Sequence, residues 1–281
     1  MPVATLNLGG HGGGPFETAY IADQIARCPV RPRRVLLSLS IHSFTRVENT
    51  WEMSIRNRFL PNVAVHFIRD FGARLGDHSL DEVQSTDKLP HALRPWAYDV
   101  RFPSIFVGGL IEGLLVGREA RNLVLLNSTV ANRGYLRFGD QPEWRGVGPD
   151  GHLAVFRPLP VLNAFFERTV SRLQQSGIEV DYATMPVNEA SFDEIEPAAR
   201  EAYAAYIASF ASRYQLFHIV GEPLPRWPAN YFGDVGLHLN ARGADVLSRQ
   251  YAACLASEPV STCPLGREPD DNHRPSDSSS P

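Results

Sequence analysis

An aspartate and a histidine near the carboxyl end of the chain have the residue types and spacing of an acid–base pair. Asp234 and His238 lie in the stretch Tyr231-Phe-Gly-Asp-Val-Gly-Leu-His-Leu-Asn-Ala-Arg-Gly243, just before an amphipathic helical pattern. A carboxylate beside an imidazole fixes its tautomer and stabilises the imidazolium, as a general base needs when it deprotonates a hydroxyl nucleophile. The sequence therefore predicts His238 as a base oriented by Asp234. The alternative is that Asp234 caps a turn and His238 is a polar residue at the helix entrance.

A second chemical feature is the glycine-rich loop at residues 9–14, which follows the strand-like run Val3–Leu8 and precedes a helical pattern. Gly12 is predicted to offer a backbone N–H to an oxyanion if it lies at the carboxyl end of that strand. The alternative is that these glycines only make a tight turn, and the two readings are compatible. His11-Gly-Gly-Gly14 also matches an oxyanion motif of lipases of another fold, but the Gly-x-Ser-x-Gly elbow that this motif requires is absent from the sequence.

Three further polar residues follow predicted strands and are candidate site residues. Ser40 and His42 come at the end of the buried run Arg34–Ile41, and Asn188 follows the run Ile178–Met185. Open α/β sheets bind ligands at the carboxyl ends of their strands, so we expect these side chains near a substrate.

Composition limits the partners. The chain has 281 residues, 43% hydrophobic and 21% charged, with a net charge of −4, which gives no electrostatic reason to expect nucleic acid as a partner. No run is long enough to cross a bilayer, and no histidines have metal-ligand spacing, so we expect no membrane span, no metal and no cofactor. Three cysteines are expected as free thiols, although a Cys254–Cys263 bridge is compatible with export. Oligomeric state and compartment are left open.

Strand-like and helical runs alternate along the chain, which predicts a parallel sheet with helices on both faces. One domain is expected over residues 1–258, with a helical or irregular insertion at 45–120 and a disordered tail at 259–281. Residues 133–155 lack periodicity and indicate a long surface loop. The expected strands are Val3–Leu8, Arg34–Ile41, Ile178–Met185 and Gln215–Val220; the expected helices are Phe16–Arg27, Val161–Gln175, Glu196–Tyr214 and a last one after Asn240.

Taken in order, several segments resemble the SGNH (GDSL-type) hydrolases, in the style of the DltD-like and polysaccharide O-acetylation branches. The resemblance covers about residues 3–256. The segments that carry it are Asn7-Leu-Gly9, Gly12, Pro15-Phe-Glu17, Pro32-Arg-Arg-Val-Leu-Leu-Ser-Leu-Ser40, Gly177-Ile-Glu-Val180, Pro186-Val-Asn-Glu189 and the block with Asp234 and His238. Two positions depart from the family: three residues instead of two separate Asp234 from His238, and Ser40 or His42 stands where the family has an asparagine.

The resemblance implies a three-layer α/β/α sandwich with a flavodoxin-like parallel sheet. It also implies a serine esterase or O-acyltransferase that acts on ester groups, expected to be acetyl, of a carbohydrate, lipid or small molecule. In that mechanism a serine attacks the ester carbonyl, His238 takes its proton, and Gly12 helps to stabilise the oxyanion. The competing hypothesis is a non-catalytic binding or scaffold protein with the same fold.

The serine of the family's first block is not found in this sequence. In the strand order 2-1-3-4-5, the strand that carries it lies between Val3–Leu8 and Arg34–Ile41 and would precede Met1. We therefore expect the chain as written to be nearly inactive, with Ser40 the only nearby substitute. An omitted central strand leaves buried backbone groups unpaired, at about 1–3 kcal/mol each. Either the protein is longer, or the two flanking strands close against each other.

Overall fold

The computed structural model describes residues 13–46, 71–79, 123–124, 127, 130–131, 141–148, 151–234 and 237–256. The predicted strand at Val3–Leu8, Gly12, most of the predicted insertion and the tail at 259–281 lie outside these residues. The chain divides into two compact units: unit 1 comprises Met1–Gln24, Ser43–Leu136 and Pro158–Thr169, and unit 2 comprises Ile25–His42, Arg137–Arg157 and Val170–Pro281. Among the described residues, no helix is both long and apolar enough to cross a lipid bilayer.

Unit 1 contains the first parts of helices α1 (Pro15–Arg27) and α7 (Pro160–Gln175). These parts pack through Phe16 and Phe165, whose rings meet edge to face with centroids 4.6 Å apart. The Glu17 carboxylate accepts the backbone N–H of Gly14 at 2.7 Å, which caps the first turn of α1. At the first turn of α7, the Asp77 carboxylate accepts the backbone N–H of Val161.

Unit 2 holds a parallel three-stranded sheet. Its strands are β1 (Arg34–Leu39), β2 (Glu179–Thr184) and β4 (Phe217–Ile219), in the spatial order β1-β2-β4. The register pairs Leu37 with Tyr182 and Tyr182 with Ile219. The 3-10 helix η1 (Ile41–Phe44) follows β1, so the predicted strand ends two residues early.

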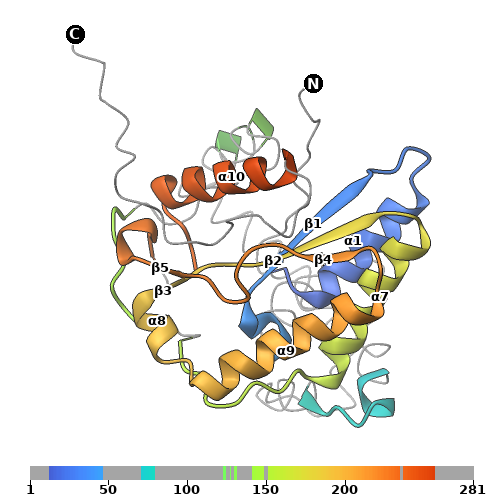
Figure 1. Ribbon diagram of the computed structural model, residues 1–281, viewed down its shortest axis with the longest axis horizontal. Coiled ribbons are helices and arrows are strands. Elements are labelled where there is room, and N and C mark those ends of the chain that lie inside the picture. Colours follow the sequence, from blue (N-terminus) through green and yellow to red (C-terminus); the bar gives the residue numbers. More distant parts are fainter. Residues whose placement is uncertain are drawn as a thin grey trace, which may run out of the picture. The chain divides into compact units, whose positions relative to one another are not determined.

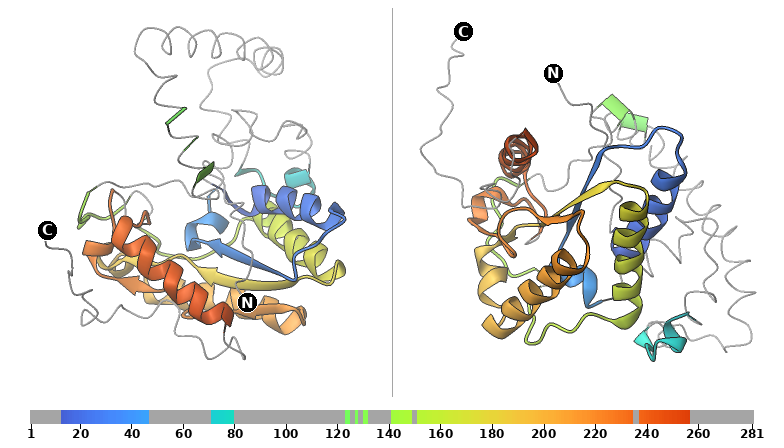
Figure 2. Two further views of the ribbon diagram at one scale, coloured as in Figure 1. Left: turned by 90° about the horizontal axis from the view of Figure 1, so that it is seen from above. Right: turned by 45° about the vertical axis from the view of Figure 1, so that its right-hand side comes forward.

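Helices cover both faces of this sheet (Figures 1 and 2). On one face, Tyr182 of β2 donates to or accepts from the hydroxyl of Tyr203 in α9 (Pro197–Arg213) at 2.8 Å. On the other face, Ala183 packs in a buried cluster with Cys254 of α10 (Ala241–Ala256). Because adjacent strand residues point to opposite faces, Tyr182 and Ala183 fix α9 and α10 on opposite sides of β2. The predicted α/β class with a parallel sheet is confirmed.

A smaller parallel pair lies beyond the carboxyl end of β2. Its strands are β3 (Val187–Asn188) and β5 (Arg226–Trp227), joined to the short helix α8 (Glu189–Asp193) and to the 3-10 helix η3 (Ala229–Tyr231). Neither short strand has a pattern long enough to be read from the sequence, because a two-residue strand has no periodicity.

Most of the described helices agree with expectation, as do β1, β2 and β4 apart from their ends. Gly177 follows α7 in the left-handed conformation (φ +71°), with Ile178 N–H bonded to the Leu173 carbonyl, which is the geometry of a glycine helix C-cap. The cysteine expectation is wrong in one respect: Cys254 is disulfide-bonded, whereas Cys28 is a free, exposed thiol.

Candidate functional site

Asp234 and His238 lie on a hairpin-like loop between η3 and α10. An isolated antiparallel bridge joins Phe232 to Leu239. Two backbone hydrogen bonds flank it: Gly233 N–H donates to the His238 carbonyl at 2.9 Å, and Asn240 N–H donates to the Tyr231 carbonyl at 3.0 Å. The loop, called the Asp–His hairpin below (residues 231–240), turns the chain back so that two side chains four residues apart meet.

The two side chains predicted to form an acid–base pair are in contact. His238 Nδ1 lies 2.9 Å from Asp234 Oδ1, within hydrogen-bonding distance. Their side chains are 39% and 41% exposed, so the pair is partly open to solvent. When the neutral ring donates Nδ1–H to the carboxylate, the basic lone pair is on Nε2, the atom that accepts a proton from a nucleophile in Ser–His–Asp catalysis. The spacing of three intervening residues is therefore compatible with pairing.

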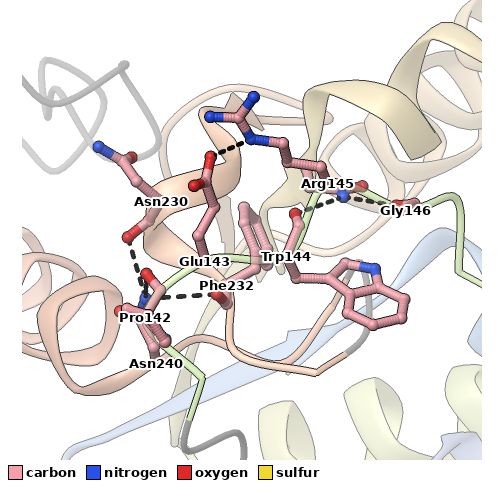
Figure 3. A network of polar contacts seen from close by, with 9 residues as sticks. Pro142, Glu143, Trp144, Arg145, Gly146, Asn230, Phe232 and Asn240 are labelled. Carbon is pink, nitrogen blue, oxygen red and sulfur yellow. Dashed lines mark hydrogen bonds and ion pairs between the residues drawn. The ribbon is translucent and has the colours of Figure 1, made fainter.

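Asn240 ties the base of the Asp–His hairpin to its surroundings (Figure 3). Its side chain is buried, and its Nδ2 lies 2.9 Å from the carbonyl oxygens of Pro142 and Asn230 and 3.3 Å from that of Phe232. Its Oδ1 accepts the backbone N–H of Gly243 at 3.0 Å. Asn240 is thus the N-cap of α10 and at the same time a donor to three carbonyl groups in two segments of backbone.

A segment at residues 142–146, called the strap below, runs beside the hairpin. One end is held by Asn240 through Pro142, and the middle by the backbone bond from Trp144 N–H to the Ala229 carbonyl at 3.2 Å. The other end is held by Asn188, whose Nδ2 donates to the carbonyls of Trp144 and Gly146. In Figure 3, Pro142 lies beside Asn240, and the Glu143 carboxylate points toward the Arg145 guanidinium of the same segment. The surface loop expected at 133–155 is therefore tied down by two buried asparagines where it is described.

A buried cluster of aromatic side chains packs against the hairpin. Trp227, Tyr231 and Phe232 make a buried cluster, against which Trp144 of the strap and Leu239 of the hairpin pack. The rings of Trp227 and Tyr231 meet edge to face with centroids 5.6 Å apart. The sequence left open whether Trp144, Trp227 and Tyr231 stack on sugars; Trp227 and Tyr231 are buried as packing residues.

The other predicted site residues are described as follows, and their site roles stay predictions. Ser40 and His42 are buried side chains directly after β1, at the carboxyl end of the sheet. Asn188 is fully buried, caps α8 by accepting the Ser191 N–H at 2.9 Å, and holds the strap. Gly12 lies outside the described residues. The structure thus brings Asp234 and His238 together, and gives Asn188 structural hydrogen bonds.

A buried charged group lies on the sheet face that α10 covers. Arg34 donates to Glu179 at 2.9 and 3.0 Å, and its Nε lies 3.3 Å from the fully buried carboxylate of Asp181. Burial raises the pKa of the Asp181 carboxyl above its ordinary value, and the positive charge of Arg34 opposes that rise. Within the described part of the chain, no cluster of three or more His, Cys, Asp or Glu side chains is arranged to hold a metal ion.

Asn240 had no predicted role, although it stands two residues after His238 and just before the last helix. An asparagine directly before a helical pattern is a helix N-cap signal and predicts one of its bonds. The contact of Asn240 with Pro142 had no sequence signal, because Pro142 lies almost 100 residues upstream.

Comparison with known proteins identifies no relative of this chain. The chain matches no protein-family model, and neither a curated protein nor a solved structure shows significant similarity to it.

Proposed function

We propose that this protein has an SGNH-type hydrolase domain whose acid–base pair is His238 with Asp234, and that the reaction is hydrolysis or transfer of an ester-linked acyl group. The observation that carries the proposal is the 2.9 Å contact between His238 Nδ1 and Asp234 Oδ1 on a loop that directly precedes the last helix. The pair is partly exposed, as a base that meets a substrate must be.

The sheet supports the finer fold assignment. In a flavodoxin-like order 2-1-3-4-5, the last three strands are adjacent, parallel and in chain order. The described strands β1, β2 and β4 are parallel and lie in that arrangement, with α9 and α10 on opposite faces. A three-layer α/β/α sandwich of the SGNH type is therefore the architecture we propose.

In the proposed reaction, a serine hydroxyl attacks the ester carbonyl while His238 Nε2 accepts its proton. Asp234 holds the ring in the Nδ1–H tautomer and stabilises the imidazolium; His238 then returns the proton to the leaving alcohol. Backbone N–H groups, with Gly12 as the candidate, stabilise the negative oxygen of the tetrahedral intermediate. Water as the acyl acceptor gives an esterase, and a sugar hydroxyl gives an O-acetyltransferase.

The 281-residue chain provides the first test. Its sequence lacks the family's serine block, so we expect it to hydrolyse p-nitrophenyl acetate no faster than its His238→Ala variant. Turnover that disappears in Ser40→Ala would show that this expectation is wrong and that Ser40 is the nucleophile.

The protein isolated from its source cells provides the second test. We expect a fluorophosphonate probe to label one serine, identified by peptide mapping, and the labelling rate to fall by about 10²- to 10⁴-fold in a His238→Ala version expressed in the same cells. A folded protein that takes no label, or takes it equally without His238, overturns the enzymatic proposal and favours a binding or scaffold protein.

A further inference from the structure

We propose that Asn240 is a positioning residue for His238: its side chain sets the geometry of the Asp–His hairpin and thereby holds the His238 ring in the tautomer that donates to Asp234. The inference relies on the proposed function only for the role of His238 as a base. The geometric part, a link between the Asn240 amide and the His238 tautomer, can be measured without any activity.

The Asp–His hairpin has little backbone support among its described residues. Between the described residues of the hairpin, two backbone hydrogen bonds flank the bridge from Phe232 to Leu239: Gly233 donates to His238, and Asn240 donates to Tyr231. A two-stranded hairpin of this kind is marginally stable by itself in water. The distance between Asp234 and His238 must therefore be fixed by contacts from outside the hairpin.

Asn240 supplies such contacts at the base of the hairpin. It lies two residues after His238, and its Nδ2 donates to the carbonyls of Asn230 and Phe232 on the opposite limb. The same amide reaches Pro142 of the strap, whose Trp144 packs on the cluster that includes Leu239. One buried amide thus joins both limbs of the hairpin to the strap.

Asn240 also fixes where α10 begins. Its Oδ1 accepts Gly243 N–H, and its carbonyl accepts Ala244 N–H at 2.9 Å. The hairpin limb that carries His238 is therefore held at the start of a helix that is packed on the sheet through Leu247 and Tyr251. Because α10 is packed on the sheet and Asn240 caps α10, the backbone of Asn240 is held in place. His238, two residues before Asn240, is positioned in turn.

The test is an isosteric exchange at Asn240, with a matched exchange at Asn188. In Asn240→Asp, an oxygen replaces the amide nitrogen that faces three carbonyl oxygens, while the helix-capping oxygen is kept. Asn188→Asp makes the same change at the other end of the strap, where the amide faces Trp144 and Gly146 and the side-chain oxygen caps α8. Both side chains are buried, so both variants are expected to lose comparable thermal stability.

The readout is the ¹⁵N spectrum of the His238 ring at a pH where it is neutral, recorded well below the unfolding temperature of each variant. We expect Asn240→Asp to lower the Nδ1–H fraction of His238 by about half or more, and Asn188→Asp to leave it at the wild-type value. If Asn240→Asp does not fold, Asn240→Ser carries the test, because serine keeps the helix cap and removes the amide donor.

A His238 tautomer that is unchanged in Asn240→Asp and in Asn240→Ser, or that changes equally in Asn188→Asp, overturns the inference. Fluorophosphonate labelling separates this result from the proposed function. If the His238 tautomer depends on Asn240 but the protein takes no label, the positioning role of Asn240 stands and the proposed enzymatic function is wrong. If the protein is labelled but the His238 tautomer does not change in the Asn240 variants, the enzymatic function stands and the positioning role is wrong.

Discussion

At the scale of single residues, the fully buried carboxylate of Asp181 is the most costly charge among those described in unit 2. It sits in the middle strand of the sheet, and its ion pair with Arg34 at 3.3 Å is shared with Glu179. Burying a carboxylate costs several kcal/mol, which a single ion pair often fails to offset. Burial is accordingly the largest influence on the Asp181 carboxyl and raises its pKa.

The raised pKa predicts a pH dependence for Asp181→Asn. The folded protein binds the Asp181 proton more tightly than the unfolded chain, so this contribution to stability is present below about pH 4 and is lost as pH rises through the folded pKa. We expect the free energy of unfolding of Asp181→Asn, relative to wild type, to rise between pH 4 and pH 7. Arg34 keeps Glu179 as its partner in the variant.

Urea denaturation at several pH values measures this difference. Ser38→Ala is the control, because Ser38 lies on the same face of the sheet, bonds the hydroxyl of Tyr251 and does not titrate in this range. The difference in the free energy of unfolding between Ser38→Ala and wild type is expected to be constant with pH. An Asp181→Asn offset that is constant, or that falls as pH rises, contradicts the assignment of burial as the dominant influence.

At the scale of elements, the first turn of α10 leaves no room for a side chain at Gly243, because η3 and the hairpin lie against it. A Cβ atom built on Gly243 would lie 2.2 Å from the carbonyl oxygen of Tyr231 and 3.0 Å from Leu239 Cδ2. The Tyr231 carbonyl also accepts the N–H of Asn240, so it cannot move aside without loosening the hairpin. The spacing of Asn240 and Gly243 therefore has a physical basis. Asn240 caps the helix, and Gly243 leaves room for the Tyr231 carbonyl.

Gly243→Ala is expected to destabilise the protein despite the better helix propensity of alanine. The gain of about 1 kcal/mol from propensity is smaller than the cost of overpacking, which is about 1–3 kcal/mol when backbone must shift. Chemical denaturation measures the difference, and Ser248→Ala, exposed on the same helix, serves as a control that should change stability by less than about 0.5 kcal/mol. A Gly243→Ala protein more stable than wild type would show that the contact relaxes without cost.

At the scale of the whole molecule, the proposed fold requires a further strand at the edge of β1 that faces away from β2. The carbonyls of Arg33 and Leu39 accept N–H groups from Glu179 and Met185. Parallel strands use alternate residues toward each neighbour, so the odd-numbered residues of β1 bond β2, and Leu36 and Ser38 point their backbone groups to the other edge. A flavodoxin-like sheet has a further strand there.

Amide hydrogen exchange tests this continuation. We expect the amides of Leu36 and Ser38 to be protected to within about tenfold of those of Val35 and Leu37, because a neighbouring strand must pair with them in the proposed fold. The Val35 and Leu37 amides are an internal control, since they face β2. Exchange at Leu36 and Ser38 faster by about 100-fold or more would show an open edge, and the proposed sheet order would then be wrong.

The sequence by itself determined the local elements and one contact of the candidate site. Helical and strand periods are set by residues close in the chain, so α1, α7, α9, α10 and the larger strands could be predicted to within a few residues. The left-handed cap at Gly177 follows from the same local physics. Asp234 and His238 were predictable as a pair because a short turn can bring together residues four positions apart.

The tertiary structure decided the contacts between distant segments. Asn188 and Asn240 each cap a helix, which a sequence pattern indicates, but the strap that both of them hold lies more than 40 residues from one and almost 100 from the other. Buried amides bond whatever carbonyl groups packing brings to them, and no period in the sequence encodes that choice. The burial of Asp181 was likewise decided by how α10 packs on the sheet, because solvent exposure depends on the assembled layers.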